Sequence, residues 1–455
     1  MTEGYTMEMK RNRIRLEKSL IKANSIINQV KENTFIIQSL KTIMLRVFGI
    51  ALLFGFTLYL THHYDPKIIG QYDFIRTYLL VVGSICLLGN EQSILYFNGR
   101  LRSINAIGEL KTVYKKMVLM IFLICVFIFL VIILIDESVI NNYFNDVNLY
   151  LILLKTTGIL FFYSLTLLNT EAFRALDSVY VAELYRNTFK YTSVILGSIL
   201  LIYIHKEVYL VDTFLVGFVF LGIISTYKIL NLFNKEVIIV NKNDTFTYTH
   251  ILKKSYPMAI SAMAIFLLMS FDIIFLKKYW GDKTVAFYAV AVKIMTIVAM
   301  IINIVNVNMA SKVAEYFSSN NKAQLIKTLK HASRLIFIFT LPITLLVCFF
   351  PTFILSFFGQ EYTAAKGALV ILIIGQGVCS IFGLAPVYLN MTGRQHLFQI
   401  ILIISVIINF SLNRFLIPYY GISGAAFAFS ASMFFWNFTA AVIIYYKDKV
   451  PVFLT

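Results

Sequence analysis

The chain has 455 residues, of which 59% are hydrophobic and only 14% are charged. Soluble domains have roughly 45–50% apolar and about 25% charged residues, so the composition excludes a soluble enzyme. Mean hydropathy is +0.78, and apolar runs near the roughly 20 residues that cross a bilayer recur along the chain. The composition predicts an all-α, polytopic membrane protein and not an enzyme.

Twelve apolar segments are expected to span the membrane. The first six lie at about 36–61, 74–97, 117–135, 149–170, 183–204 and 208–230. The second six lie at about 256–277, 285–310, 333–356, 366–390, 397–417 and 422–446. The organisation predicted from them is a first half over 35–230, a polar linker over 231–254, a second half over 255–446 and a tail over 447–455.

Positive charge alternates between the loops. The net charge of +17 would suggest nucleic acid as the partner of a soluble chain, but in a membrane protein Lys and Arg first report topology. With the N-terminus inside, the inner segments are rich in basic residues, as in Arg100, Arg102, Lys111, Lys115 and Lys116. The outer loops hold far fewer, mainly Lys67, Lys206, Lys277, Lys278 and Lys283. Both termini are therefore predicted to be cytoplasmic, and no nucleic-acid partner is expected.

Residues 1–34 are polar and basic, with apolar residues at helical spacing. We expect either an amphipathic helix in the membrane interface or a disordered basic tail that only fixes topology. No short apolar stretch with a small-residue cleavage site precedes the first span, so that span is predicted to be an uncleaved anchor.

Metal and cofactor chemistry is not expected. The four cysteines, Cys86, Cys125, Cys348 and Cys379, all lie in apolar runs and none has CxxC spacing. The sequence also has no GxxxxGK[ST] loop, so ATP-driven export within this chain is set aside.

A weak internal repeat opens each half. Residues 64–72 lead into the second span and residues 279–288 lead into the eighth. A basic residue follows in each helix, Arg76 in the first half and Lys293 in the second. Six spans per half is an even number, so the halves would be related by an axis along the membrane normal, as in some transporters. A central cavity between them is expected.

Ionisable groups inside the spans are the candidate binding residues, because each costs roughly 2.5–3.5 kcal/mol at mid-bilayer unless it meets water or a partner. Arg46, Arg76 and Lys293 lie deepest, and such a cationic cluster favours an anion, above all phosphate. Four further cations lie near span ends and either line the same cavity or extend to the headgroups: Lys41, Lys155, Arg186 and Lys190.

Two deep acids, Glu91 and Asp272, are candidate counter-ions or carriers of a proton or sodium ion. Asp272 lies one hairpin from Lys293, and we expect the two to pair when cargo is absent.

Several motifs recur in the order typical of one family. They are Arg46 early in the first span, Ile69-Gly70-Gln71-Tyr72, Leu88-Gly89-Asn90, Tyr256-Pro257 with Asp272, Phe358-Gly359-Gln360-Glu361-Tyr362, and the segment from Leu416 to Ala426. Over residues 35–446 this pattern resembles the Wzx-type oligosaccharide flippases of the multidrug/oligosaccharidyl-lipid/polysaccharide (MOP) exporter superfamily.

The resemblance implies two six-helix lobes around a V-shaped central cavity. It also implies a flippase that moves undecaprenyl-diphosphate-linked oligosaccharide repeat units from the inner to the outer leaflet of the bacterial cytoplasmic membrane, for surface polysaccharide biosynthesis. By position, Arg46, Arg76 and Lys293 would be its cationic cavity residues and Asp272 their acidic companion. Membrane lipid and polysaccharide polymerase machinery are candidate partners. The extension over 1–34 departs from the family pattern, and no role is carried over to it.

Two alternatives remain. A drug or cation exporter of the same superfamily would need acidic and aromatic cavity groups, which the net positive lumen disfavours. A non-transporting membrane subunit of polysaccharide assembly is the other; a polymerase should have long external loops, and none here exceeds about fifteen residues.

The charge alternation makes a direct prediction about topology. Reporter fusions after Lys111 and Asn241 should report the cytoplasm, and a fusion after Asn142 should report the outside. An external signal at Lys111 or Asn241, or an internal one at Asn142, would contradict twelve spans with both termini inside.

Overall fold

The computed structural model describes residues 41–42, 44–103, 107–235 and 246–453. Within these ranges the chain forms helices and turns and no strands. The expected interfacial helix over 1–34 and residues 236–245 of the expected linker lie outside the described residues.

The first half forms one helical body, the N-lobe. Its helices are Met44–His63, α2 (Pro66–Leu87), α3 (Asn90–Ser103), α4 (Leu110–Leu134), α5 (Glu137–Phe144), α6 (Leu149–Ala175), α7 (Val179–Leu184), a π-helical turn (Tyr185–Phe189), α8 (Lys190–Tyr203) and α9 (Leu210–Lys235).

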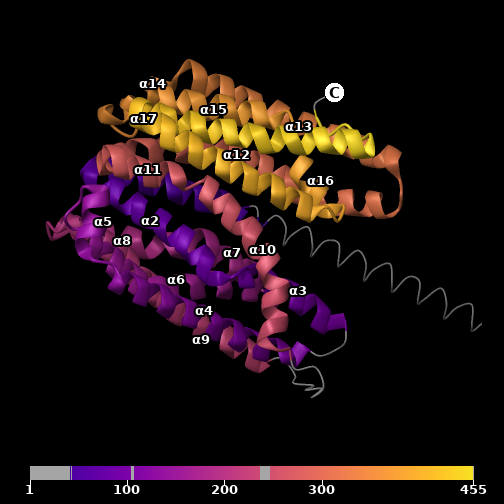
Figure 1. The fold of residues 1–455 in the computed structure, drawn as a ribbon, viewed down its shortest axis with the longest axis horizontal. Coiled ribbons are helices and arrows are strands. Elements are labelled where there is room, and N and C mark those ends of the chain that lie inside the picture. Colours follow the sequence, from indigo (N-terminus) through magenta and orange to yellow (C-terminus); the bar gives the residue numbers. More distant parts are fainter. Residues whose placement is uncertain (1–40, 43, 104–106, 236–245, 454–455) are drawn as a thin grey trace, which may run out of the picture.

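The second half forms the other body, the C-lobe. Its helices are α10 (Tyr248–Leu268), α11 (Phe271–Trp280), α12 (Asp282–Ser318), α13 (Lys322–Phe349), α14 (Pro351–Ser356), α15 (Lys366–Ser380), α16 (Ala385–Met391) and α17 (Gln395–Asp448). Figure 1 shows the two bodies as separate groups of roughly aligned helices.

The predicted all-α, two-lobe membrane fold is confirmed. Nine helices of the described ranges are long and apolar enough to cross a membrane, and the bent pair α2–α3 makes a tenth. Helix α17 is 54 residues long and has a non-helical residue, Gly421, with φ 53° and ψ −129°, so it contains two spans. The predicted fifth span coincides with α7, the π-helical turn and α8, none of which is long enough alone. The chain is a multi-pass membrane protein.

The second span differs most from its predicted bounds. Helix α2 begins at Pro66 instead of residue 74, because the Asp65 carboxylate caps it by accepting a hydrogen bond from the Lys67 amide at 2.7 Å. The helix breaks at Leu88 and Gly89, which have φ values of 50° and 73°. At Gly89 a Cβ would lie 2.4 Å from the Ser255 carbonyl oxygen, so glycine allows α10 to pack here.

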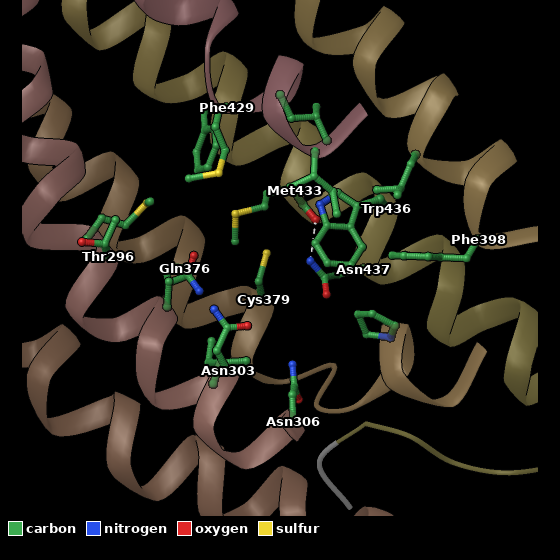
Figure 2. A pocket seen from close by; sticks show the side chains of 18 of the residues that line it. Thr296, Asn303, Asn306, Gln376, Cys379, Phe398, Phe429, Met433, Trp436 and Asn437 are labelled. Atoms are coloured by element: carbon green, nitrogen blue, oxygen red, sulfur yellow. Dashed lines mark hydrogen bonds between the residues drawn. The ribbon is translucent and has the colours of Figure 1, made fainter. Parts of the chain in front are cut away.

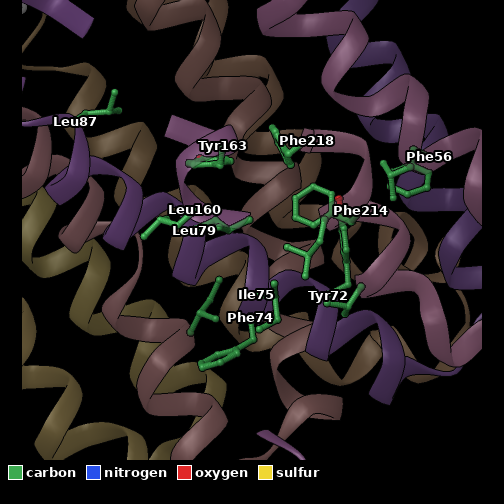
Figure 3. Packing of buried hydrophobic residues seen from close by; sticks show 14 of the residues in the cluster. Phe56, Tyr72, Phe74, Ile75, Leu79, Leu87, Leu160, Tyr163, Phe214 and Phe218 are labelled. Carbon is green, nitrogen blue, oxygen red and sulfur yellow. The ribbon is translucent and has the colours of Figure 1, made fainter. Parts of the chain in front are cut away.

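Aromatic side chains build the core of the N-lobe between α2, α6 and α9 (Figure 3). The rings of Tyr72 and Phe214 meet edge to face with centroids 4.9 Å apart, and Tyr163 meets Phe218 at the same distance. Such pairs add about 0.5–1.5 kcal/mol beyond their area burial. Part of the aromatic content therefore packs helices together instead of facing lipid.

The lobes meet along α2 and α12 and come together where α5 and α11 lie (Figure 1). There the Lys277 ammonium lies 2.5 Å from Asp146 of the N-lobe and 2.7 Å from Asp282, and only 2% of its side chain is exposed. Lys277 was expected in an external loop, but the contact between lobes buries it. We call Asp146, Lys277 and Asp282 the lobe clasp. Toward α3 and α16 the lobes diverge, and α10 crosses between them (Figure 1).

Gly70 brings the lobes into close contact, because a Cβ there would lie 1.7 Å from the Asp282 carbonyl oxygen. We predict that Gly70→Ala destabilises the folded protein, since overpacking costs roughly 1–3 kcal/mol or more. The matched control is Gly55→Ala, where nothing lies within 4 Å of the new methyl group and a small gain is expected. Thermal unfolding in detergent tests this; equal melting temperatures for the two variants would contradict it.

Candidate functional site

A group of charges lies where the lobes meet at mid-helix. The Lys293 ammonium on α12 donates a hydrogen bond to Asp73 Oδ2 on α2 at 2.9 Å, so the ion pair joins the lobes. Arg76, one turn after Asp73, has Nη2 3.3 Å from Asp73 Oδ1. We call Asp73, Arg76, Lys190, Tyr191 and Lys293 the central ion cluster.

Helix α8 completes this cluster. The Lys190 ammonium lies 4.8 Å from the centroid of the neighbouring Tyr191 ring. The Tyr191 hydroxyl interacts electrostatically with Lys190, Arg76 and Lys293. Arg76 and Lys293 thus share the Asp73 carboxylate, and Lys190 lies beside Tyr191. With three cations and one carboxylate, the cluster carries excess positive charge.

The Arg76 guanidinium is only loosely held. Its Nε is buried without a hydrogen-bond partner among the described residues, and Asp73 Oδ1 likewise accepts none. The Arg76 side chain is 34% exposed, whereas the Asp73 side chain is fully buried. Because a guanidinium binds oxyanions through a fork of N–H donors, Arg76 has unused capacity on its exposed side.

Arg76 and Lys293 occupy corresponding places after the repeated hairpins, and the structure brings them to the same carboxylate. Asp73 itself was missed because the second span was expected to begin at residue 74. The signal was available: a helix started by the Asp65 cap places Asp73 and Arg76 on one face at i and i+3.

Arg46 does not join the central ion cluster. Its Nη2 lies 2.9 Å from Glu183 Oε1, and Arg174 reaches the same oxygen at 3.1 Å. Asn187 donates to the other Glu183 oxygen at 2.7 Å, so this fully buried carboxylate is satisfied. The structure therefore does not bring Arg46 together with Arg76 and Lys293, and its role as a cavity cation stays a prediction.

Arg186 belongs with Arg46 and not with Lys190. It pairs with Glu171, which Arg174 also contacts at 3.1 Å. We call these five residues the arginine–glutamate cluster: Arg46, Glu171, Arg174, Glu183 and Arg186. Its three cations meet two carboxylates, all from the N-lobe.

Two expected cavity cations lie at the surface. The Lys155 ammonium is 2.9 Å from Asp212, and the two side chains are 57% and 36% exposed. Lys41 is exposed near the start of the first helix. Neither contacts the central ion cluster, because both lie close enough to a span end to reach the outside of the helical bundle.

The two deep acids, Asp272 and Glu91, do not contact the cations that they were expected to balance. Asp272 is 1% exposed and accepts hydrogen bonds from the Tyr288 hydroxyl at 2.6 Å and the Asn413 amide at 2.8 Å. No cation of the described residues contacts it, because Lys293 pairs with Asp73 instead. Glu91, in the first turn of α3, has one carboxylate oxygen buried without a hydrogen-bond partner there. Within the described ranges, both acids thus lack a cationic partner.

The MatE family model matches residues 257–415, most of the C-lobe. None of the curated proteins matches the sequence closely enough to count as a relative.

Solved structures match nearly the whole chain. The lipid II flippase MurJ in an inward closed conformation has a TM-score of 0.70 at 15% identity, over 90% of this chain and 87% of that one. An inward-facing multidrug resistance MATE family transporter of the MOP superfamily has a TM-score of 0.67 at 12% identity, over 87% and 93%. The MATE multidrug transporter DinF-BH has a TM-score of 0.65 at 15% identity, over 91% and 94%. The chain therefore contains a MatE segment and has the two-lobe fold of these MOP transporters.

Proposed function

We propose that this protein is a MOP-superfamily flippase that carries undecaprenyl-diphosphate-linked oligosaccharide repeat units from the inner to the outer leaflet of the bacterial cytoplasmic membrane. The observation that carries the proposal is the central ion cluster, in which Arg76 and Lys293 share the buried Asp73 carboxylate at the contact between the lobes. Lys190, beside Tyr191, adds a third cation. The fold shared with the lipid II flippase MurJ supports it.

A diphosphate suits the unused capacity of this cluster. Charge-assisted bonds from Arg and Lys to phosphate are about twice as strong as neutral hydrogen bonds. Arg76 can turn the exposed part of its guanidinium to the anion without first losing a hydrogen bond, because its side chain donates none to the described residues. Lys293 would then divide its donors between Asp73 and the diphosphate, while the lipid tail stays in the bilayer.

The same geometry connects binding to movement of the lobes. In the observed conformation the Lys293–Asp73 pair ties α12 to α2. A diphosphate that competes with Asp73 weakens this tie, so cargo binding would favour the alternative arrangement of two rigid lobes. Asp73 thus takes the competing role that the sequence assigned to Asp272.

The membrane potential favours this direction of transport. A head group with about two negative charges that leaves a negative interior gains about 2.3 kcal/mol per charge per 100 mV if it crosses the whole field. Asp272 and Glu91 are the proposed carriers if a proton or sodium ion is also coupled. The proposal includes cytoplasmic termini and a handover of the exported cargo to polymerase machinery.

Export of organic cations is the second candidate. The MatE match and the fold shared with multidrug transporters favour it, as does Asp272, a buried carboxylate that no described cation contacts. The excess of cations in the central ion cluster argues against it, because it would repel such a substrate.

Removing charge from Lys293 tests the anion site. We predict that Lys293→Gln lowers flipping of a fluorescent undecaprenyl-diphosphate-linked sugar in proteoliposomes by at least about ten-fold, since a bond to a charged group is worth about 1.5–3 kcal/mol. Arg76→Lys should keep part of the activity, because the charge remains and the fork is lost. The matched control, Lys155→Gln, breaks only an exposed ion pair and should flip cargo normally.

Folding and substrate binding can be separated. Lys293→Gln alone breaks the buried pair and leaves Asp73 with Arg76 as its remaining cation, at 3.3 Å, and breaking a buried ion pair costs about 3–5 kcal/mol. The double variant Asp73→Asn/Lys293→Gln removes both charges and should recover the melting temperature without recovering flipping. Wild-type flipping by the double variant would contradict a cationic substrate site.

The driving force gives a further prediction. Flipping of the lipid-linked cargo should increase when an inside-negative potential is imposed, because negative charge moves outward. Asp272→Asn should uncouple turnover from cargo supply if this acid carries the coupled ion. If voltage has no effect and a pH or sodium gradient alone drives transport of an organic cation, the second candidate replaces the first.

A further inference from the structure

The C-lobe contains a cavity that none of the charged clusters uses. Its volume is about 360 Å³, within the roughly 300–1,000 Å³ of small-molecule sites. Residues of α10, α12, α15, α16 and α17 and of the turn before α16 line it. Figure 2 shows several side-chain amides around one space: those of Asn303, Asn306, Gln376 and Asn437. We call this cavity the amide pocket.

The amides hold unused hydrogen-bonding capacity. Gln376 is 5% exposed, yet its side chain makes no hydrogen bond to any described residue. Asn306 Oδ1 is buried without a hydrogen-bond partner there. The Asn437 amide donates one hydrogen bond to the Met433 carbonyl oxygen at 2.8 Å. A buried amide without a partner costs about 1–3 kcal/mol, so these groups are costly unless a ligand satisfies them.

The chemistry of the lining selects the ligand. Among the described residues, no Asp, Glu, Lys, Arg or His lines the amide pocket, so neither a diphosphate nor an organic cation finds an opposite charge there. Amides both donate and accept, which matches hydroxyl and acetamido groups. Trp436 and Phe429 add flat apolar faces beside them (Figure 2). An uncharged, hydroxyl-rich ring fits this combination.

We propose that the amide pocket binds an uncharged sugar ring of the cargo, an inference that rests on the proposed flippase function. Thr296 lines the pocket three residues after Lys293 on α12, a rise of roughly 4.5 Å. A diphosphate at the central ion cluster therefore places the first sugars beside the pocket. The cations bind the diphosphate, which all such lipids share, and the amides bind the sugar, which differs between them.

The pocket also has an open and a closed side. Asn303 and Asn390 are exposed, whereas Gln376 and Asn437 are buried. A sugar enters past the exposed pair and reaches the buried pair, so Gln376 is the residue with the greatest influence on specificity.

Binding measurements with three defined lipids test the inference. The probes are undecaprenyl diphosphate without sugar, with one hexose and with one N-acetylhexosamine, and dissociation constants are measured on the full protein in phosphatidylethanolamine–phosphatidylglycerol nanodiscs. At least one sugar-bearing lipid should bind about ten-fold more tightly than the bare lipid, as two new hydrogen bonds would give. Gln376→Met and Asn306→Leu should each remove most of this preference and leave the affinity for the bare lipid unchanged.

Stability separates a ligand-binding role from a structural one. Both variants replace an unsatisfied polar group with an apolar group of similar size, so the melting temperature without ligand should stay equal or rise. Asn308 is an exposed amide on α12, the helix that carries Asn306. Asn308→Ala is the matched control and should keep the sugar preference.

These measurements distinguish a failure of the sugar pocket from a failure of the flippase proposal. Equal affinity for all three lipids, or a variant that weakens bare and sugar-bearing lipids alike, overturns the sugar pocket and leaves the flippase proposal intact. If no lipid binds, or if Lys293→Gln weakens none of them, the flippase proposal fails and the sugar pocket fails with it.

Discussion

The ion pair between Lys293 and Asp73 is the interaction on which the arrangement of the two lobes depends. It joins α12 to α2 at 2.9 Å, and both side chains are nearly excluded from solvent. Burial makes each charge costly to leave alone, and each is stabilised mainly by the other. Whatever changes the charge balance at this point also changes the contact between the lobes, so the proposed anion site and the lobe contact share the same few atoms.

Composition and hydropathy were sufficient to predict an all-α, multi-pass fold because membrane-spanning helices must satisfy their own backbone hydrogen bonds. The two-lobe arrangement was predicted from the internal repeat and the family resemblance. The hairpin repeat also indicated that Arg76 and Lys293 are related, and both contact Asp73. Asp73 was missed because hydropathy places the start of a span where apolar residues begin, whereas the Asp65 cap starts the helix earlier. Hydropathy is therefore least able to identify charged residues, such as Asp73, that lie near the predicted end of a span.

Other features depended on tertiary contacts that no local pattern encodes. Arg46 lies deep in its span, as expected, but Glu183, 137 residues away in the chain, determines where its side chain points. The amides of the pocket come from four helices, α12, α15, α16 and α17, and isolated Asn and Gln residues in apolar runs give no recognisable spacing. Lys277 looks like a loop residue because the neighbouring Lys278 and Lys283 are charged too.

The lobe clasp has an energetic consequence for any state in which the lobes separate near α5 and α11. Asp146, Lys277 and Asp282 would lose their short contacts together, and water would have to enter before the pairs could part. Hydration of the clasp thus becomes an activation barrier, separate from cargo recognition. In the proposed transport cycle, such a barrier would keep this side of an empty protein sealed and would limit leakage of ions across the membrane.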